Sequence, residues 1–277
     1  MKKYASVYVL WLLLFVIAPI GLIVFYSLSG VKHPEFSNFH WSLVQYKRVF
    51  SPIYLKILWR SIVLSGVSTF VCLLVGYPVA YAISVAPARR QKFLILFFIV
   101  PMWMNFLLRT YAWLTLLGNH GLINRAFALI GLGPFDLMYN DLAILLGMIY
   151  NFLPFMVLPI YSILAKLDGS LIEAARDLGA NGLTVFTRVV FPLSLPGVMT
   201  GVTMVFIPAI STFVISALLG GNKYYLIGNL IEQQFRFTGN WPFGAALSVL
   251  LIGIMLLMLW LGRLFDRNGV EKGGVVF

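Results

Sequence analysis

Six long apolar stretches dominate the sequence, and each has about the length that a helix needs to cross a membrane. Shorter polar segments separate the apolar stretches. The six apolar stretches are Val7–Leu28, Ser61–Ser84, Phe93–Leu117, Ala143–Ala165, Leu193–Leu219 and Gly244–Phe265. A helix needs about 20 mostly apolar residues to span the hydrocarbon core. Only 10% of the residues are charged and the mean hydropathy is +0.93, which is far from the composition of a soluble domain. We therefore predict an all-α integral membrane protein with six transmembrane helices.

The first apolar stretch resembles a signal peptide, because Lys2 and Lys3 precede it. It is too long for the apolar region of a signal peptide and lacks a clear cleavage site of small residues, so we expect a retained anchor. In the outer segment that follows, Tyr46–Trp59 is expected to form an amphipathic helix at the interface. The chain then divides into an anchor with this outer segment, a five-helix core and a tail, which cover residues 1–60, 61–265 and 266–277.

Basic residues indicate the orientation of the chain. Six spans place both termini on the same side of the membrane. The polar segments on that side carry the higher density of Lys and Arg residues, which are Lys2, Lys3, Arg89, Arg90, Lys92, Lys166, Arg176, Arg188, Arg263, Arg267 and Lys272. The remaining Lys and Arg residues are spread over longer loops. Because Lys and Arg concentrate in cytoplasmic loops, we expect a protein of the bacterial inner membrane with both termini in the cytoplasm.

The sequence lacks the residue groupings that catalysis or cofactor binding requires. His33, His40 and His120 lie apart from Cys or carboxylate residues at a metal-ligand spacing, and Cys72 is alone in an apolar run. The net charge of +11 comes from residues at the ends of apolar runs rather than from a nucleic-acid-binding patch. No G-x-x-x-x-G-K-[ST] phosphate loop occurs. We expect no catalytic site, no metal site and no ATP site in this chain.

The segment between the fourth and fifth apolar stretches is expected to contain a short cytoplasmic helix over Leu171–Ala180. Asp168 or Ser170 is suited to cap its start, and Gly179 to form the left-handed turn at its end. A helix of under three turns is not stable alone in water, so it needs a surface to pack against. From the residues alone, a solvated loop remains the alternative.

The same segment carries a motif. Glu173-Ala174-Ala175, then Gly179, then Val189-Val190-Phe191-Pro192 resembles the EAA loop of permease subunits of binding-protein-dependent ABC importers, although that family usually has Ile and Leu at the positions of Val189 and Phe191. The resemblance implies a MetI-like type I importer fold with a coupling loop over residues 166–192. It also implies that a separate ATPase dimer binds ATP and Mg²⁺ and contacts the coupling residues Glu173, Ala174, Ala175, Arg176, Asp177 and Gly179.

Other runs resemble the spermidine/putrescine permease subunits of the PotB type within that family. They are Gly76–Tyr81, Pro101–Asn105 with Arg109–Trp113, Leu226–Ile231 and Trp241–Ala246. The resemblance implies a polyamine cargo, a periplasmic or extracellular solute-binding protein and a second, different permease subunit. Phosphonate, opine or amino-acid-like solutes and iron remain alternative cargoes. An autonomous secondary transporter is a different class, but the predicted spans contain no acidic residue for ion coupling.

Several residues are candidates for the substrate path of such an importer. A polycation should meet carboxylates or aromatic faces, which makes Glu232 a candidate, with an ion pair to Arg236 as the alternative. The other candidates are Trp103, Asn105, Tyr111, Trp113, Tyr150 and Asn151, for which packing or an interfacial position is the alternative. Arg109 in the third stretch would repel a polycation, and we expect it to form a gate or a structural pair with Asp141 or Glu232.

Overall fold

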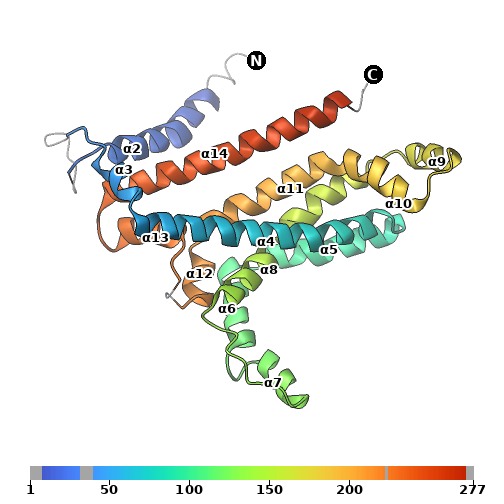
Figure 1. Ribbon diagram of the computed structural model, residues 1–277, viewed down its shortest axis with the longest axis horizontal. Helices are drawn as coiled ribbons and strands as arrows, with labels where there is room; N and C mark the ends of the chain where they lie inside the picture. The colour runs from blue at the N-terminus through green and yellow to red at the C-terminus, as the bar shows by residue number, and fades with distance from the viewer. Residues whose placement is uncertain (1–7, 32–39, 222–223, 273–277) are drawn as a thin grey trace. The chain divides into compact units, whose positions relative to one another are not determined.

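The computed structural model describes residues 8–31, 40–221 and 224–272, with side chains described as far as Arg263. The chain forms two compact units (Figure 1). Met1–Ser61 and Tyr225–Met255 make up unit 1, and Ile62–Tyr224 and Leu256–Phe277 make up unit 2. The described residues are mostly helical and contain no strand. The elements are η1 (Leu13–Ile17), α2 (Ala18–Ser27), α3 (Val44–Val49), α4 (Pro52–Ser84), α5 (Ala88–Trp103), α6 (Phe106–Leu117), α7 (Leu122–Leu129), α8 (Asp141–Leu164), α9 (Gly169–Asp177), α10 (Gly182–Val185), η2 (Phe186–Val190), α11 (Phe191–Ser211), α12 (Val214–Leu219), α13 (Ile227–Arg236) and α14 (Trp241–Lys272).

Helices of membrane-spanning length match most of the predicted spans. Five of them are long and apolar enough to cross a membrane, which are Tyr8–Ser27, Pro52–Ser84, Asp141–Leu164, Gly182–Ser211 and Trp241–Arg263. The pair Ala88–Trp103 and Phe106–Leu129 passes the same test only when it is taken together, and it is bent by 95° at its break. The prediction of an all-α membrane protein is confirmed, with up to six spans if the bent pair counts as one.

The third predicted span, Phe93–Leu117, is not the continuous helix that its apolar composition suggests. α5 ends at Trp103, and Met104 adopts an extended backbone with ψ of 146°. The Asn105 side chain then accepts hydrogen bonds from the backbone N–H groups of Leu107 at 2.8 Å and Leu108 at 3.4 Å, which starts α6 in a new direction. A capping side chain satisfies the free N–H groups at a helix start, so one polar residue is enough to stabilise the break.

The fifth predicted span, Leu193–Leu219, is wrong at both ends. Its helix starts at Gly182 and passes through α10, η2 and α11 before it stops at Thr212, where ψ is 137°. α12 follows as a separate short helix. The single interfacial helix predicted over Tyr46–Trp59 is also wrong, because α3 ends at Val49 and Pro52 begins α4. Proline is favoured at the first turn of a helix, where its missing N–H costs nothing.

The ends of the chain lie partly outside the described residues. Val7, the first residue of the first predicted span, and the basic residues Lys2 and Lys3 are among the residues that the structure does not describe. At the other end, α14 continues to Lys272, beyond the predicted end of the sixth span at Phe265. Helical backbone therefore extends into the predicted tail over residues 266–277.

Unit 1 packs through its aromatic side chains. The ring of Phe243 lies 4.9 Å from the ring of Tyr54 and 4.3 Å below the guanidinium carbon of Arg48. In addition, the backbone N–H of Ile227 donates a hydrogen bond of 2.8 Å to the hydroxyl of Ser61. These contacts join the start of α4 to α13 and to the start of α14.

Unit 2 is centred on the crossing of α8 and α11, which lie side by side (Figure 1). Gly197 and Gly201 are one turn apart on α11 and are buried. A Cβ atom added at Gly197 would meet the carbonyl oxygen of Pro159 at 3.0 Å, and one at Gly201 would meet the sulfur of Met156 at 2.7 Å. Glycines at this spacing let two membrane helices approach closely, so the two backbones pack almost directly against each other.

Candidate functional site

α9 lies in the loop between α8 and α10, at the end of unit 2 opposite to α6 and α7 (Figure 1). Its N-cap is Asp168, whose carboxylate accepts a hydrogen bond of 3.0 Å from the backbone N–H of Ser170. This hydrogen bond lowers the pKa of Asp168 below its ordinary value, because it favours the ionised carboxylate. The predicted cap at Asp168 is confirmed, and the helix begins at Gly169 rather than at Leu171.

The end of α9 is a Schellman motif. The N–H of Ala180 donates to the carbonyl oxygen of Ala175 at 3.1 Å, and the N–H of Gly179 donates to that of Arg176 at 2.8 Å. Gly179 has a φ of +81°, a conformation that strains residues with a side chain. The predicted stop at this glycine is confirmed, so both ends of the short helix are defined by local hydrogen bonds.

α9 contacts α10 and η2, but it leaves most of its surface open in the part of the chain that the structure describes. Leu178 is 89% exposed and Leu183, just beyond it, is 74% exposed. The residues predicted to contact the ATPase are also exposed, namely Glu173, Ala174, Arg176, Asp177 and Gly179, whereas Ala175 is half-buried. The site therefore presents two large apolar side chains among charged ones, which is a surface suited to a protein partner.

Aromatic contacts connect η2, which α9 contacts, to α4. The ring of Phe186 in η2 lies 5.8 Å from the ring of Tyr77 and 5.6 Å from the ring of Tyr81, both on α4. The hydroxyls of Tyr77 and Ser194 are hydrogen-bonded at 2.8 Å, which joins α4 to α11. A displacement of α9 would therefore act on α4 and α11 through packed side chains.

The turn between α4 and α5 is joined to α8 at the same end of unit 2. The Gln91 amide nitrogen donates to the carbonyl oxygens of Ser84 at 2.9 Å and Ala86 at 2.8 Å. Its amide oxygen accepts a hydrogen bond of 3.0 Å from the Tyr161 hydroxyl on α8. A single side chain thus closes the turn and fixes it to the helix that leads into α9.

The structure brings together some of the predicted substrate-path residues and separates others. Trp113 on α6 and Tyr150 on α8 form an edge-on aromatic pair with 5.4 Å between ring centroids. Asn151 is next in sequence and is buried; its amide nitrogen donates to the Gly147 carbonyl oxygen at 2.8 Å, while its amide oxygen has no hydrogen-bond donor. Trp103 is 82% exposed at the end of α5 and is not part of this group.

Two further candidates have different local roles. Asn105 caps α6 through its side-chain oxygen, which explains the residue without a ligand. Glu232 forms an ion pair of 2.7 Å with Arg236, one turn along α13. The alternative interpretation of Glu232 as half of a local pair is therefore observed. Tyr111 is half exposed on α6.

Arg109 does not form the predicted pair. Its side chain is buried, with 8% exposure, and its Nε has no acceptor among the residues that the structure describes. The guanidinium carbon lies 6.0 Å from the ring of Phe106, and no carboxylate among the described residues forms an ion pair with it. The expected pair of Arg109 with Asp141 is thus absent from the described part of the chain.

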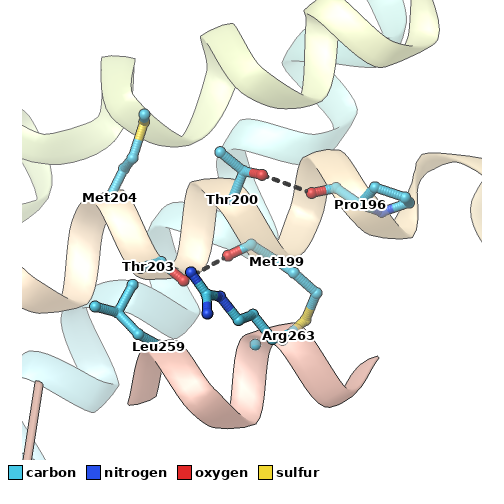
Figure 2. A pocket seen from close by; sticks show the side chains of 8 residues that line it. Pro196, Met199, Thr200, Thr203, Met204, Leu259 and Arg263 are labelled. Carbon is cyan, nitrogen blue, oxygen red and sulfur yellow. Dashed lines mark hydrogen bonds between the residues drawn. The ribbon is translucent and has the colours of Figure 1, made fainter. Parts of the chain in front are cut away.

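A groove that the sequence did not predict lies between α11 and α14 in unit 2. It has a volume of about 260 Å³, and Figure 2 shows Arg263 beside Thr203 along it. The hydroxyls of Thr200 and Thr203 donate to carbonyl oxygens of their own helix at 2.8 Å. The lining residues are Pro196, Met199, Thr200, Thr203, Met204, Leu259, Gly262 and Arg263. The groove therefore combines a mostly apolar wall with one exposed cation.

Comparison with known families now adds to this geometry. Residues 73–268, which include the α9 segment and all of α11, match the model of the family described as binding-protein-dependent transport system inner membrane component. The chain belongs to this family. It is accordingly a multi-pass membrane permease component and not itself an enzyme.

The relatives of this permease include named polyamine transport proteins. The chain is 38% identical to the spermidine/putrescine transport system permease protein PotB of Haemophilus influenzae over 252 residues, which cover 90% of this chain and 88% of that protein. It is 39% identical to the protein of the same name from Escherichia coli K12 over 264 residues, which cover 93% of this chain and 96% of that protein. The predicted family resemblance is confirmed.

Solved structures support the fold of the permease. A bacterial ABC transporter involved in alginate import superposes with a TM-score of 0.78 at 16% identity, covering 96% of this chain and 95% of that one. A chain of the MetNI methionine ABC transporter superposes with a TM-score of 0.60 at 20% identity, covering 78% and 95%. The predicted MetI-like fold is confirmed at this level.

Sequence reasoning missed several residues that hold the permease together. Two hydrogen bonds join residues far apart in the sequence, one between Tyr77 and Ser194 and one between Tyr161 and Gln91. No local sequence pattern indicates either pair. The two glycines of α11 did have a signal, since Gly197-Val-Met-Thr-Gly201 is a G-x-x-x-G motif within an apolar stretch. That motif would have predicted the close helix crossing.

Proposed function

We propose that this chain is one permease subunit of an ATP-driven importer for polyamines such as spermidine and putrescine. The observation that carries the proposal is α9, a short helix defined at both ends that exposes Leu178 and charged side chains at one end of unit 2. Such a helix is too short to be independent. Its exposed surface is explained if a partner protein covers it in the working assembly.

The partner that fits α9 is the ATPase of the importer. The sequence has no phosphate-binding loop, so the ATP and Mg²⁺ that drive transport belong to a separate subunit. Closure of an ATPase dimer would displace α9, and the contacts of Phe186 with Tyr77 and Tyr81 would pass the motion to α4 and α11. Rigid-body motion of packed helices is an established way to switch between two states.

The orientation follows from the same assignment. The ATPase is cytoplasmic, so α9 and the turn before α5 face the cytoplasm, as the basic residues Arg89, Arg90, Lys92 and Lys166 already indicate. The N- and C-termini are then cytoplasmic, and α6 and α7 are on the outer side. A solute-binding protein would deliver its cargo to that outer side.

The cargo assignment rests on the named relatives. Identity of 38 to 39% extends over nearly the full length of two spermidine/putrescine permease proteins, which supports a polyamine over phosphonate, opine-like or iron cargo. The PotB-type resemblance also supports a second, different permease subunit, so that the pathway forms between two related chains.

The experiment that tests this function is uptake into proteoliposomes that contain this chain, its second permease and the ATPase. We expect uptake of labelled spermidine only with ATP inside the vesicles and the loaded binding protein outside. Uptake of a phosphonate but of no polyamine would refute the cargo. Uptake by the permease chains alone, without any ATPase, would refute the ATP-driven mechanism and favour an autonomous carrier.

A further inference from the structure

A second cavity lies at the end of unit 2 opposite to α9. Its volume is about 640 Å³, within the range of small-molecule pockets, and its lining residues are Leu114, Gly118, Asn119, Asp136, Met138 and Tyr139. We call it the outer cavity. Its walls come from the end of α6 and from the segment that leads into α8.

The first wall of the outer cavity is held in place by a buried side chain. Asn124 on α7 is only 3% exposed. Its amide nitrogen donates to the carbonyl oxygens of Gly118 at 3.2 Å and Phe135 at 3.0 Å, and its amide oxygen accepts from the N–H of Phe135 at 3.0 Å. These three hydrogen bonds hold Gly118 and the residue before Asp136 in a fixed relation.

The second wall contains an unusual backbone. Tyr139 has a φ of 59°, a left-handed conformation that is strained for a residue with a bulky side chain. Its N–H donates to the carbonyl oxygen of Leu219 at 2.9 Å, and its ring packs against Gly221. The Asn140 amide nitrogen also donates to the carbonyl oxygen of Asp136 at 2.9 Å. Strain that is maintained by such contacts is typical of functional sites.

The charge of the outer cavity is uncompensated in the described structure. Asp136 has no ion pair among the described residues, in contrast to Glu232, which Arg236 neutralises at 2.7 Å. Asn119 and Tyr139 add an amide and an aromatic ring to the same wall. A carboxylate beside an aromatic ring is the chemistry that attracts an organic ammonium group.

We propose that the outer cavity receives a terminal ammonium group of the polyamine, with Asp136 as the charged contact. The inference rests on the proposed function, since it assigns a place to the cargo of that importer. It moves the cation contact from Glu232, whose charge is already paired, to Asp136. The fixed walls keep the Asp136 carboxylate at the outer cavity without a conformational change.

The first test is uptake by the complete importer with substitutions at Asp136. Asp136→Asn should lower spermidine uptake at low concentrations of loaded binding protein by about fivefold, the scale of one exposed charge contact, while Asp136→Glu should retain most of it. Equal uptake by Asp136→Asn and wild type would overturn the proposal, as would a larger loss in Glu232→Gln than in Asp136→Asn.

The second test measures occupancy directly and does not depend on transport. The chain has one cysteine, Cys72, which is buried, so Met138→Cys introduces a single accessible thiol in the outer cavity. Spermidine should slow maleimide labelling of this thiol in the assembled importer, and the uncharged diol 1,8-octanediol should not. Protection that persists when Asp136→Asn is added would contradict the assignment.

The two proposals fail in different ways. If the wild-type importer takes up no polyamine, the proposed cargo is wrong and the ammonium site falls with it. If the wild type imports polyamine but Met138→Cys is never protected, the cargo assignment holds and the outer cavity alone is excluded.

Discussion

Gly179 is the residue on which the end of α9 depends. Its φ is +81°, and nothing lies within 4 Å of the position that a Cβ would take, so only its backbone conformation requires glycine. We expect Gly179→Ala to destabilise the Schellman turn by about 1 kcal/mol and to reduce ATP-driven uptake with insertion unchanged. Gly179→Asp should act in the same direction.

Gly169→Ala is the matched control for this prediction. Gly169 is also in α9 and has equally open surroundings, but its φ is not in the left-handed region. Alanine favours a helix over glycine, so uptake by Gly169→Ala should equal that of wild type or exceed it. Equal effects of the two substitutions would show that the backbone of Gly179 is not what matters.

Asp168 makes the start of α9 sensitive to acid. Its pKa is lowered by the hydrogen bond from the N–H of Ser170. A lowered folded-state pKa means that the stabilisation is complete at neutral pH and is lost as the pH falls below about 4 toward the folded pKa. Hydrogen exchange of the α9 amides, corrected for its intrinsic pH dependence, should therefore report opening of the helix in acid.

Asp168→Asn is the control for the acid effect, because asparagine caps a helix but does not titrate in this range. The difference in hydrogen exchange of the α9 amides between wild type and Asp168→Asn should be constant above about pH 5 and should shrink at lower pH. A difference that is independent of pH down to pH 3 would rule out the carboxylate as the origin.

Residues whose partners are local were predictable from the sequence. Asp168 and Gly179 act within a few positions of themselves, so cap and turn preferences identify them. Arg109 was predicted to lie in a continuous third span and to form an ion pair, but it lies in α6, beyond the break that Asn105 caps. The hydrogen bond between Tyr77 and Ser194 joins residues 117 positions apart, and no local rule predicts such a partner.

At the scale of elements, the crossing of α8 and α11 sets the packing of unit 2. A Cβ at Gly197 would meet backbone atoms of Pro159 and Ile160 at 3.0 and 3.1 Å, which cannot move easily. We expect Gly197→Ala to lower the free energy of unfolding in detergent by about 1–3 kcal/mol, the usual cost of overpacking. Thermal unfolding followed by circular dichroism would measure it.

Two comparisons make this prediction specific. A Cβ at Gly201 would come closest to the flexible Met156 sulfur at 2.7 Å, with backbone atoms of Met156 at 3.2 and 3.3 Å, so Met156→Ala should only partly rescue Gly201→Ala. Gly66 on α4 has no atom within 4 Å of its Cβ position, and Gly66→Ala should be neutral. A neutral Gly197→Ala would refute the close approach of the two helices.

The approximate location of the spans was predictable, but their exact ends and their continuity were not. Apolar length alone identified the regions of α4, α8 and α14, because the membrane requires about 20 residues of one character. The break after α5 is capped by a single residue, Asn105, and the break after α11 falls at Thr212. Neither residue changes the apolar average much. Hydropathy averaged over many residues therefore cannot detect these breaks.

At the scale of the whole molecule, the family could be predicted because Glu173-Ala174-Ala175 and Gly179 have the spacing of a motif that belongs to this family. None of residues 173–179 is buried in the described part of the chain, so packing within this chain does not explain their pattern. The outer cavity was not predictable, since it is assembled from α6, α7 and the segment before α8. Its walls meet only in the folded unit.

The central claim is that α9 contacts the ATPase, and chemical cross-linking tests it most directly. Leu178 beyond α9 and Leu129 on α7 are both 89% exposed, and Cys72 is buried, so Leu178→Cys and Leu129→Cys are matched single reporters at opposite ends of unit 2. In the assembled, ATP-hydrolysing importer, a short cross-linker with one maleimide and one photoreactive benzophenone group should join Leu178→Cys to the ATPase and leave Leu129→Cys unjoined. A cross-link from Leu129→Cys but not from Leu178→Cys would contradict the account.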